Sequence, residues 1–444
     1  MSGTRVPQRG VALLGLAGGM LVVAGGLTGA YYVVATRSEA RAATVKEPKT
    51  PDAPKVASST DLPGQKVDVK TAGGTVKMTW AELGIETDQD EVGRTQYPVK
   101  LDRDKAVVAL IKLKAKYDKS PVDAYLDLEE RQIHEDAPGV GIDPWGSLPK
   151  LLAAARSGQQ SVELASVPVP ASTTKATLGI DDISTVMGHY ITKFPVTDRD
   201  RNFNLKLAAS KINGTVLQPH VEWSFNGQVG ERSEKEGYKI AHVITAGEMV
   251  DGLAGGTCQI STTLFGAAFF AGLDIPKTTN HSRPSVYTPL GFDATVVWPD
   301  TDLVLKNPYD FPVAIHYRVA NGEALVEILG KARPFDKIVF ARKLLEETPY
   351  GTEERLDDEM PDGQTMLDQA GFNGYKLTRF RRFYKGKEMV REQKWTVNYK
   401  PVTEYIRRGT NKDPNAQMPK EKEIHPLKAP DEKEFTDERV VLAQ

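Results

Sequence analysis

A single cysteine, Cys258, is the residue of this chain with the most distinctive chemistry. It lies in Gly-Gly-Thr-Cys-Gln-Ile-Ser-Thr-Thr-Leu-Phe and has no second cysteine with which to form an intrachain disulfide. The two glycines permit a tight turn, and the apolar residues from Gln259 to Ala271 recur at helical spacing and stop before Gly272. We therefore expect Cys258 at a helix N-terminus, where unpaired amides and the helix dipole lower the pKa of a thiol.

His281 and Asp293 follow Cys258 in the order nucleophile, base and orienting group. A cysteine nucleophile needs an imidazole to accept its proton, and the imidazole needs a carboxylate to hold its tautomer. This order resembles transglutaminase-like and papain-type sites, in which the cysteine starts a helix and the other two residues lie on strands that follow. A free cysteine is also often a small buried apolar side chain, so a structural reading of Cys258 stays open.

Four further residues are candidates for substrate binding: Arg283, Gln259, Ser282 and Asn226. The planar fork of Arg283 suits a substrate carboxylate, although it suits a buried acidic side chain equally well. Gln259, or an amide at the helix start, is a candidate donor to an oxyanion. Asn226 is a candidate for loop hydrogen bonding, and a structural role in a turn is the favoured interpretation. The histidines are scattered without the spacing of metal ligands, so we expect no metal site and no cofactor.

Length and charge restrict the class of protein. A chain of 444 residues is long enough for two or three domains with linkers. Its composition is 40% hydrophobic and 26% charged, which is typical of a globular protein, and its formal net charge is −2. Without a basic excess to neutralise phosphates, nucleic acid is not an expected partner.

The N-terminus carries an uncharged stretch from Gly10 to Ala35 that is long enough to cross a bilayer. We expect residues 1–37 to be a cytoplasmic N-terminus and a retained signal anchor, which makes this a single-pass protein of the cytoplasmic membrane. Cleavage near Ala40 to Ala43 is the alternative. Two arginines flank each end of the stretch, so charge does not fix the orientation. A long trailing domain is commonly translocated, so we expect the bulk on the periplasmic or extracellular side.

The rest of the chain divides by composition into five segments. Residues 38–60 are a flexible linker, 61–171 a β-rich module of two similar halves, 172–332 the central domain, 333–412 a C-terminal β-module, and 413–444 a disordered charged tail. In the first module we expect strands at 66–70, 75–80, 122–128 and 161–165, and helices at 104–117 and 148–155. The predicted fold class is α+β and multidomain.

The central segment resembles the VanW-like family, which is named for an accessory protein of glycopeptide-resistance gene clusters. The motifs run from Arg201 to about Gly330: Arg-Asn-x-Asn, Trp-Ser-Phe-Asn, Val-Gly-x-Arg, Gly-Gly-x-Cys-Gln-x-Ser-Thr-Thr-Leu, His-Ser-Arg-Pro and Asp-Ala-Thr-Val. Three residues depart from the usual pattern: Trp223 replaces phenylalanine, His220 replaces glycine, and Ala254 replaces the first of three glycines. None of these is Cys258, His281 or Asp293.

The flanking segments resemble modules found beside such domains. Residues 61–171 are similar to a peptidoglycan-binding module that also precedes some L,D-transpeptidases, and residues 333–412 are similar to small glycine-containing β-modules. The resemblance implies a bacterial envelope protein with peptidoglycan as partner, and it does not supply a reaction. Two hypotheses follow. One is a Cys-His-Asp thiol hydrolase or transferase acting on peptide or amide bonds of the wall, and the other is a non-catalytic peptidoglycan-binding or envelope assembly protein.

Overall fold

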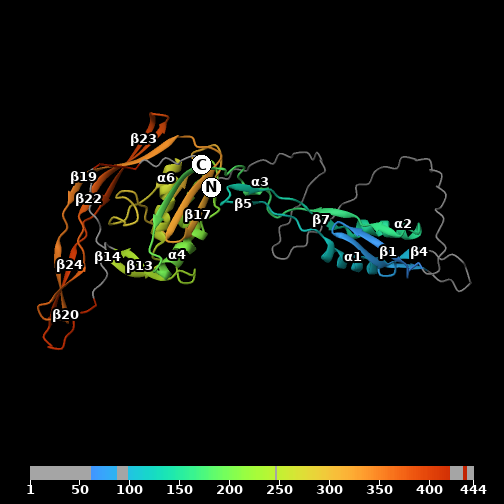
Figure 1. Ribbon diagram of the computed structural model, residues 1–444, viewed down its shortest axis with the longest axis horizontal. Coiled ribbons are helices and arrows are strands. Elements are labelled where there is room, and N and C mark those ends of the chain that lie inside the picture. The colour runs from blue at the N-terminus through green and yellow to red at the C-terminus, as the bar shows by residue number, and fades with distance from the viewer. Residues whose placement is uncertain (1–61, 88–98, 246–247, 421–433, 438–444) are drawn as a thin grey trace, which may run out of the picture. The chain divides into compact units, whose positions relative to one another are not determined.

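The computed structural model describes residues 62–87, 99–245, 248–420 and 434–437 (Figure 1). The predicted membrane anchor at 1–37 and the predicted linker at 38–60 lie outside these residues. Within the described ranges, no helix is long and apolar enough to cross a membrane. The described chain has several modules, which are rich in β-strands and also contain helices.

The N-terminal module is built on a three-stranded sheet. Its strands β1 (Lys66–Thr71), β2 (Gly74–Thr79) and β8 (Ser161–Glu163) lie in the order β2-β1-β8, and β8 runs parallel to β1. Val67 and Val69 alternate on the buried face of β1, as expected for a half-buried strand. Helices α1 (Arg103–Tyr117) and α2 (Pro144–Arg156) pack together and complete a core that includes Trp80.

Both helices of this module begin at an aspartate that caps the first turn. The carboxylate of Asp102 accepts from the N–H of Lys105 at 3.1 Å, and that of Asp143 accepts from the N–H of Gly146 at 3.0 Å. The two predicted helices are confirmed, but the strand predicted at 122–128 is reduced to Tyr125–Asp127. The similarity of the two halves stays a prediction. The short strands of the module are β3 (Ile85–Thr87), β4 (Val99–Leu101), β5 (Tyr125–Asp127), β6 (Gln132–His134), β7 (Gly139–Ile142) and β9 (Ser166–Val169).

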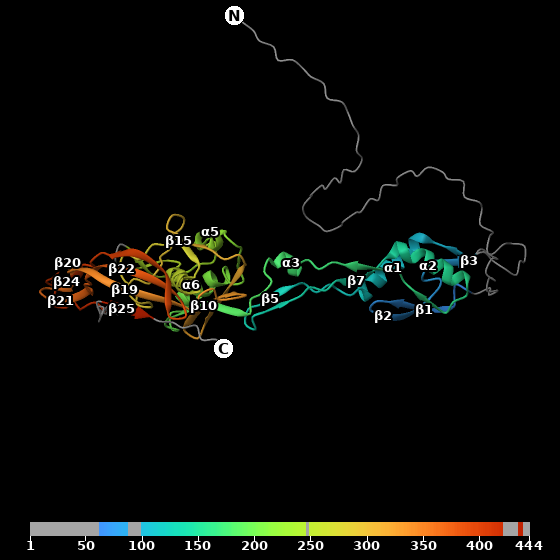
Figure 2. The ribbon, with the colours of Figure 1, turned by 90° about the horizontal axis from the view of Figure 1, so that it is seen from above.

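The central domain surrounds one helix, α6 (Thr257–Ala271), which is buried along almost its whole length. It packs on an antiparallel sheet in the order β10-β18-β17-β11 (Figure 2). The strands of this sheet are β10 (Thr185–Lys193), β18 (Glu323–Gly330), β17 (Val313–Ala320) and β11 (Val216–Leu217). Helix α4 (Arg199–Ser210) packs against α6 and β17. The chain therefore places its most apolar helix at the centre of the domain.

Two glycines allow α6 and β10 to approach each other closely. A Cβ atom added at Gly188 in β10 would lie 2.2 Å from the backbone nitrogen of Ala271. A Cβ added at Gly266 in α6 would lie 2.4 Å from the ring of Tyr190. Both distances are shorter than any contact that a real Cβ atom makes. The helix and the strand can approach this closely only because Gly188 and Gly266 have no side chains.

Smaller elements frame the sheet and carry the loops. A second sheet has the order β12-β16-β15, and a hairpin pairs β13 with β14. The elements are α3 (Lys175–Leu178), β12 (Glu222–Ser224), α5 (Phe225–Val229), β13 (Ile240–Thr245), β14 (Glu248–Leu253), β15 (Asp274–Lys277) and β16 (Val304–Lys306).

Two of the three departures from the VanW-like pattern fall where the backbone is left-handed. His220 and Ala254 both have a φ of 61°, a conformation that glycine adopts without strain and other residues adopt rarely. Nε2 of His220 lies 2.9 Å from Oδ1 of Asp310. The left-handed backbone at both positions thus explains why glycine is usual there.

The C-terminal module contains two sheets. One has the order β23-β22-β19-β25 and the other the order β20-β24-β21, with β20 parallel to β24. The strands are β19 (Lys337–Thr348), β20 (Thr352–Pro361), β21 (Thr365–Gln369), β22 (Gly374–Lys385), β23 (Glu388–Tyr399), β24 (Glu404–Asn411) and β25 (Glu434–Asp437).

Strand β25 corrects the prediction that all of residues 413–444 are disordered. It pairs with β19, and the ring of Phe435 lies 6.0 Å from that of Phe340, with the guanidinium of Arg342 over its face. These aromatic contacts stabilise β25 as an edge strand within an otherwise charged segment.

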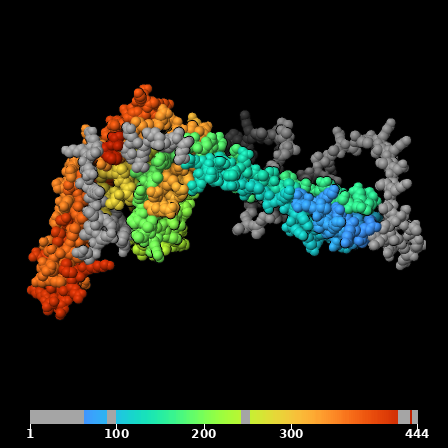
Figure 3. Space-filling view, viewed as in Figure 1, coloured from blue at the N-terminus to red at the C-terminus, as the bar shows by residue number. Residues whose placement is uncertain are grey.

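The C-terminal module and the central domain share one core. Phe340 of β19 lies 4.6 Å from Phe292, and Phe383 of β22 belongs to the same buried cluster. Arg381, which is fully buried, donates to the carbonyls of Leu273 at 2.8 Å and Ala268 at 3.1 Å. These carbonyls lie in the last turn of α6 and just beyond it, and the amides of Gly272 and Leu273 also donate to that of Ala268. The module therefore adds charge-assisted hydrogen bonds at the helix C-terminus. Figure 3 draws the central domain in green to orange and the C-terminal module in orange to red.

The packing of α6 on β10 predicts an unusual response to Gly266→Ala. Alanine in a helix is normally favoured over glycine by about 1 kcal/mol, but here the new methyl group meets the Tyr190 ring. Overpacking of this kind costs about 1–3 kcal/mol. We expect a net loss of stability in denaturant unfolding.

Gly351→Ala is the control, because no heavy atom lies within 4 Å of its added Cβ. This variant should unfold within about 0.5 kcal/mol of the parent. A Gly266→Ala variant that is more stable than the parent would contradict the close approach of β10 to α6.

Candidate functional site

Cys258 is the second residue of α6, and every other residue of that helix is buried. The helix begins after Gly256, whose φ of 104° supports the tight entry predicted from the glycines. The amides of Thr257 and Gln259 donate to the carbonyls of Ala254 and Gly256. Among the described residues, none accepts from the N–H of Cys258. The predicted helix start is therefore confirmed, and its thiol is the partly exposed group of α6.

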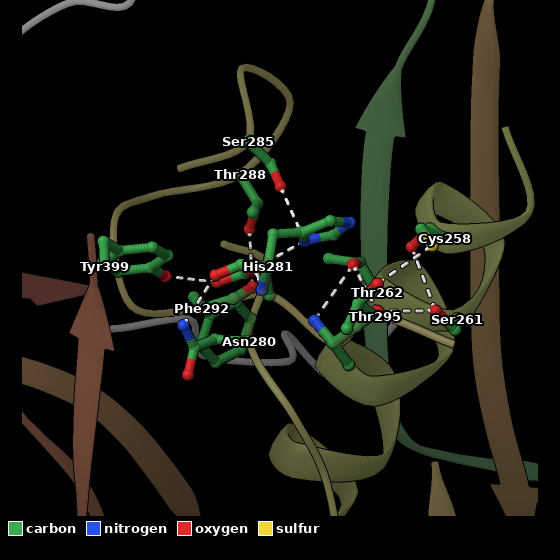
Figure 4. A network of polar contacts seen from close by, with 12 residues as sticks. Cys258, Ser261, Thr262, Asn280, His281, Ser285, Thr288, Phe292, Thr295 and Tyr399 are labelled. Carbon is green, nitrogen blue, oxygen red and sulfur yellow. Dashed lines mark hydrogen bonds and ion pairs between the residues drawn. The ribbon is translucent and has the colours of Figure 1, made fainter. Parts of the chain in front are cut away.

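The thiol is held by the segment that follows Asp293. Sγ of Cys258 lies 3.2 Å from Oγ1 of Thr295 and 3.4 Å from the carbonyl oxygen of Val296. The hydroxyls of Ser261 and Thr262 in α6 donate to the carbonyl of Ala294 at 2.6 and 3.1 Å. These bonds fasten the segment to the first turns of the helix (Figure 4).

His281 and Asp293 form a buried pair at 6% and 2% exposure. Oδ2 of Asp293 accepts from the backbone N–H of His281 at 2.7 Å and lies 2.6 Å from its Nδ1. Because a carboxylate only accepts, the proton lies on Nδ1, and Nε2 is left for the thiol. Figure 4 shows the imidazole between Tyr399 on one side and Cys258 on the other. The structure thus brings together the three residues that the sequence placed in order.

The environment of each group favours a thiolate beside an imidazolium. Burial alone would raise the pKa of Cys258, but a hydrogen bond and the charge of His281, together with Thr295 and Val296, lower it to about 7. Burial likewise opposes a charged imidazole, yet Tyr287, Asp293 and Cys258 raise the pKa of His281 well above its usual value. The pKa of Asp293 is lowered against its burial, chiefly by the hydrogen bond and charge of His281. Such tuning is typical of cysteine nucleophiles.

Two arginines that the sequence analysis did not select lie near the thiol. Nη2 of Arg201 donates to Oε1 of Gln259 at 2.7 Å, while Nη1 is buried without a partner among the described residues. Arg232 donates to Oδ1 of Asn226 at 2.9 and 3.0 Å. Burial lowers the pKa of both arginines, and the charge of Cys258 opposes this effect in both. Both lie in motifs of the VanW-like resemblance, Arg-Asn-x-Asn and Val-Gly-x-Arg, which was the available signal.

The predicted ligand residues do not share one function. Gln259 donates its side-chain amide to Oγ1 of Thr192 at 2.9 Å and to the carbonyl of Lys193 at 3.0 Å. Its side chain is used within the fold, which leaves the helix-start amide as the oxyanion donor. Asn226 donates to the carbonyls of Val297, Pro299 and Thr301 at 3.0 to 3.2 Å, and so secures a loop.

Ser282 and Arg283 lie in the loop of His281, where Ser282 is exposed and burial lowers the pKa of Arg283. Their contact with a substrate stays a prediction. The expectation that His281 and Asp293 lie on strands was wrong, because the segment between β15 and β16 has no strand. Within the described ranges, no three His, Cys, Asp or Glu side chains are placed to hold a metal ion together.

Comparison with known proteins identifies two regions. Residues 200–329 match the family described as VanW like protein, and residues 343–411 match the G5 domain. The VanW-like resemblance is thereby confirmed, and the C-terminal β-module contains a G5 domain. The N-terminal peptidoglycan-binding module stays a prediction.

Two curated proteins are similar over the central region. The uncharacterized protein YoaR of Bacillus subtilis (strain 168) is 38% identical over 142 residues, which is 32% of this chain and 47% of YoaR. The vancomycin B-type resistance protein VanW of Enterococcus faecalis (strain ATCC 700802 / V583) is 26% identical over 144 residues, which is 31% of this chain and 52% of VanW. The chain therefore spans about half the length of each of these relatives.

Among solved structures, the IgA1 protease G5 domain is 21% identical and covers 17% of this chain and 92% of its own length, with a TM-score of 0.13. This score is too low to support an argument about the fold.

The geometry predicts that Cys258 reacts as a thiolate near neutral pH. Alkylation by iodoacetamide should follow an apparent pKa of about 7, and His281→Ala should move it upward to the usual thiol range of about 8.5. The reason is that the hydrogen bond and charge of His281 are the largest effects that lower the pKa of Cys258. The measurement is the rate of alkylation against pH, with the labelled residue identified by mass spectrometry.

His316→Ala is the matched control, because His316 is a second buried histidine paired with a carboxylate, Glu327, at 3.0 Å. It should leave the alkylation profile unchanged. An unchanged profile in His281→Ala would show that the imidazole does not act on the thiol.

Proposed function

We propose that this protein modifies the bacterial cell wall, and that its central domain cleaves or transfers peptide or amide bonds of peptidoglycan through Cys258. The observation that carries this proposal is the half-buried cysteine at a helix start, with its pKa lowered to about 7 beside an imidazole fixed by a buried carboxylate. A structural cysteine has no need of such an arrangement.

The chemistry follows from the positions of the groups. The thiolate of Cys258 attacks the carbonyl carbon of an amide and forms a carbon–sulfur bond, while the carbonyl electrons move to the oxygen. The N–H of Cys258 is the candidate donor to this oxyanion. The tetrahedral intermediate collapses, the carbon–nitrogen bond breaks, and the imidazolium of His281 gives its proton to the leaving amine.

A thioester then remains on Cys258. Neutral His281 accepts a proton from water or from an incoming amine, which attacks the thioester carbonyl and releases the thiolate. Water gives hydrolysis and an amine gives transfer. Asp293 stays ionised throughout and holds the imidazole in place.

Several features support the cell wall as the site of action. VanW of Enterococcus faecalis carries a name that refers to vancomycin resistance, and G5 domains are generally associated with binding to the cell wall or peptidoglycan. The N-terminal module resembles a peptidoglycan-binding module. We also propose attachment to the cytoplasmic membrane through residues 1–37, with the bulk of the chain on the outer side, because the stretch from Gly10 to Ala35 is long and uncharged.

The alternative is a non-catalytic wall-binding or envelope assembly protein. The G5 match favours it, since such a domain binds without chemistry. The bonds made by Gln259 and Asn226 within the fold are also compatible with a rigid binding domain. This alternative requires an unreactive Cys258.

Cys258→Ala separates the two hypotheses. The parent protein, incubated with purified peptidoglycan fragments, should change their peptide bonds and carry a covalent acyl group on Cys258, because the thioester is an obligatory intermediate. The variant should do neither. Mass spectrometry of the fragments and of the protein measures both outcomes.

Binding to intact sacculi and the melting temperature are the controls, and both should be the same for the parent and for Cys258→Ala. If the variant processes the wall as well as the parent does, the thiol is not the nucleophile and the binding hypothesis is favoured.

A further inference from the structure

The loop that carries His281 and Asp293 is held from two sides. One side is α6 of the central domain, through the hydroxyls of Ser261 and Thr262. The other side is the C-terminal module. Oη of Tyr399, the last residue of β23, donates to Oδ1 of Asp293 and accepts from the N–H of Gly291 at 3.0 Å. The orienting carboxylate thus has a direct partner from a different module.

Further bonds join the end of β23 to the same loop. Nδ2 of Asn280 donates to the carbonyl of Asn398 at 2.9 Å, and the N–H of Lys400 donates to the carbonyl of Ser282 at 3.2 Å. Tyr399 lies between these two contacts. The end of β23 is therefore bonded to the loop on both sides of Tyr399. These bonds fix the position from which the Tyr399 side chain reaches Asp293.

Two arginines of the C-terminal module hold the other arm of the loop. Nη1 of Arg342 donates to the carbonyl of Leu290 at 3.0 Å, and Nη1 of Arg379 donates to the carbonyl of Gly291 at 3.3 Å. Both arginines are buried, at 8% and 3% exposure. Since buried guanidinium groups are fixed by their partners, they restrict where Gly291 and Asp293 can lie.

The two oxygens of Asp293 have separate partners. Oδ2 takes both bonds from His281, and Oδ1 takes the bond from Tyr399. Rotation of the carboxylate would break the Tyr399 bond and tilt the oxygen that aligns Nδ1. The phenol therefore fixes the carboxylate plane, and the carboxylate plane fixes the imidazole.

The charged and titratable groups that face Asp293 are His281, Tyr287, Arg379 and Tyr399. Burial, and then the charge of Asp293, raise the pKa of Tyr399 well above its usual value, so its hydroxyl stays a donor. Burial lowers the pKa of Arg379 to about 10, which leaves it cationic at neutral pH.

The thiol itself faces His281, Tyr287, Arg201 and Arg232. Of these groups only His281 is in contact with Asp293 through a hydrogen bond. An effect of Tyr399 on the thiol must therefore pass through Asp293 and His281.

We propose that Tyr399 is a positioning residue of the reactive centre, so that the nucleophile becomes competent only when the C-terminal module is seated on the central domain. This inference rests on the proposed function of Cys258. It makes the module that contains the G5 domain part of the reactive unit, in addition to any binding it performs.

Tyr399→Phe in the full-length chain tests the proposal, with the rate of Cys258 alkylation by iodoacetamide followed against pH. Loss of the hydroxyl frees the carboxylate to rotate and weakens the imidazole bond, so the apparent pKa of the thiol should rise by about one unit. Alkylation at pH 7 should then fall about fivefold, while the rate above pH 10 should match that of the parent, because the thiolate is complete there.

Tyr375→Phe is the matched control. It removes another buried tyrosine hydroxyl from the same sheet, one that donates to Oε1 of Glu347 at 3.2 Å. Its profile should equal that of the parent, and equal shifts in both variants would overturn the proposal. The shift caused by Tyr399→Phe should also vanish when Asp293→Asn is already present, because the two residues act in series.

Asn280→Ala gives a second, milder test if Tyr399→Phe melts below the assay temperature. It removes the bond to the carbonyl of Asn398 from a partly exposed side chain and should shift the profile in the same direction by a smaller amount. A parent thiol with an apparent pKa near 7 and unshifted variants would overturn the Tyr399 proposal alone. A parent thiol with an ordinary pKa would overturn both this proposal and the proposed function.

Discussion

The carboxylate of Asp293 is 2% exposed, and an unpaired charge at that depth would cost several kcal/mol. Its burial is tolerated because three donors converge on it: the backbone N–H and Nδ1 of His281, and the hydroxyl of Tyr399. The donors come from two modules, so the charge can be buried only when both are in place. This requirement determines the path of the loop and the direction of the imidazole. It also determines where the C-terminal sheet packs on the central domain.

Polar groups on the buried surface of α6 set its rotation. An apolar helix packs in many rotational positions at similar energy, but Ser261, Thr262 and Thr263 each have a specific partner. A rotated helix would bury these hydroxyls without acceptors. The rotation they select is the one that turns Cys258 toward Thr295.

The sequence patterns predicted those features that interactions between neighbouring residues determine, such as helix ends and single strands. The glycines before Cys258 and after Ala271 give both ends of α6, and the alternation in Lys66–Thr71 gives a strand. The order of cysteine, histidine and aspartate predicted their meeting, because the residues lie within one continuous segment. The strands expected around His281 did not form, since the bonds of this loop go to side chains and to a neighbouring module.

Contacts between distant segments could not be predicted in this way. Tyr399 follows Asp293 by 106 residues, and its sequence context, Asn-Tyr-Lys-Pro-Val, indicates a β-module but no contact with Asp293. Asn226 appeared free to bind a ligand because its three carbonyl acceptors lie more than 70 residues further along the chain. Phe435 likewise gives no sign of its partner Phe340.

The separation of Tyr399 from Cys258 also has a consequence for timing. A chain emerges from the ribosome N-terminus first, and its domains fold in that order. When α6 and the loop of His281 have been made, the residue that completes the partners of Asp293 has yet to be synthesised. On the role proposed for Tyr399, the nascent protein therefore passes through a stage in which its cysteine exists without activation, and the order of synthesis keeps the thiol latent until the strand ending at Tyr399 is in place.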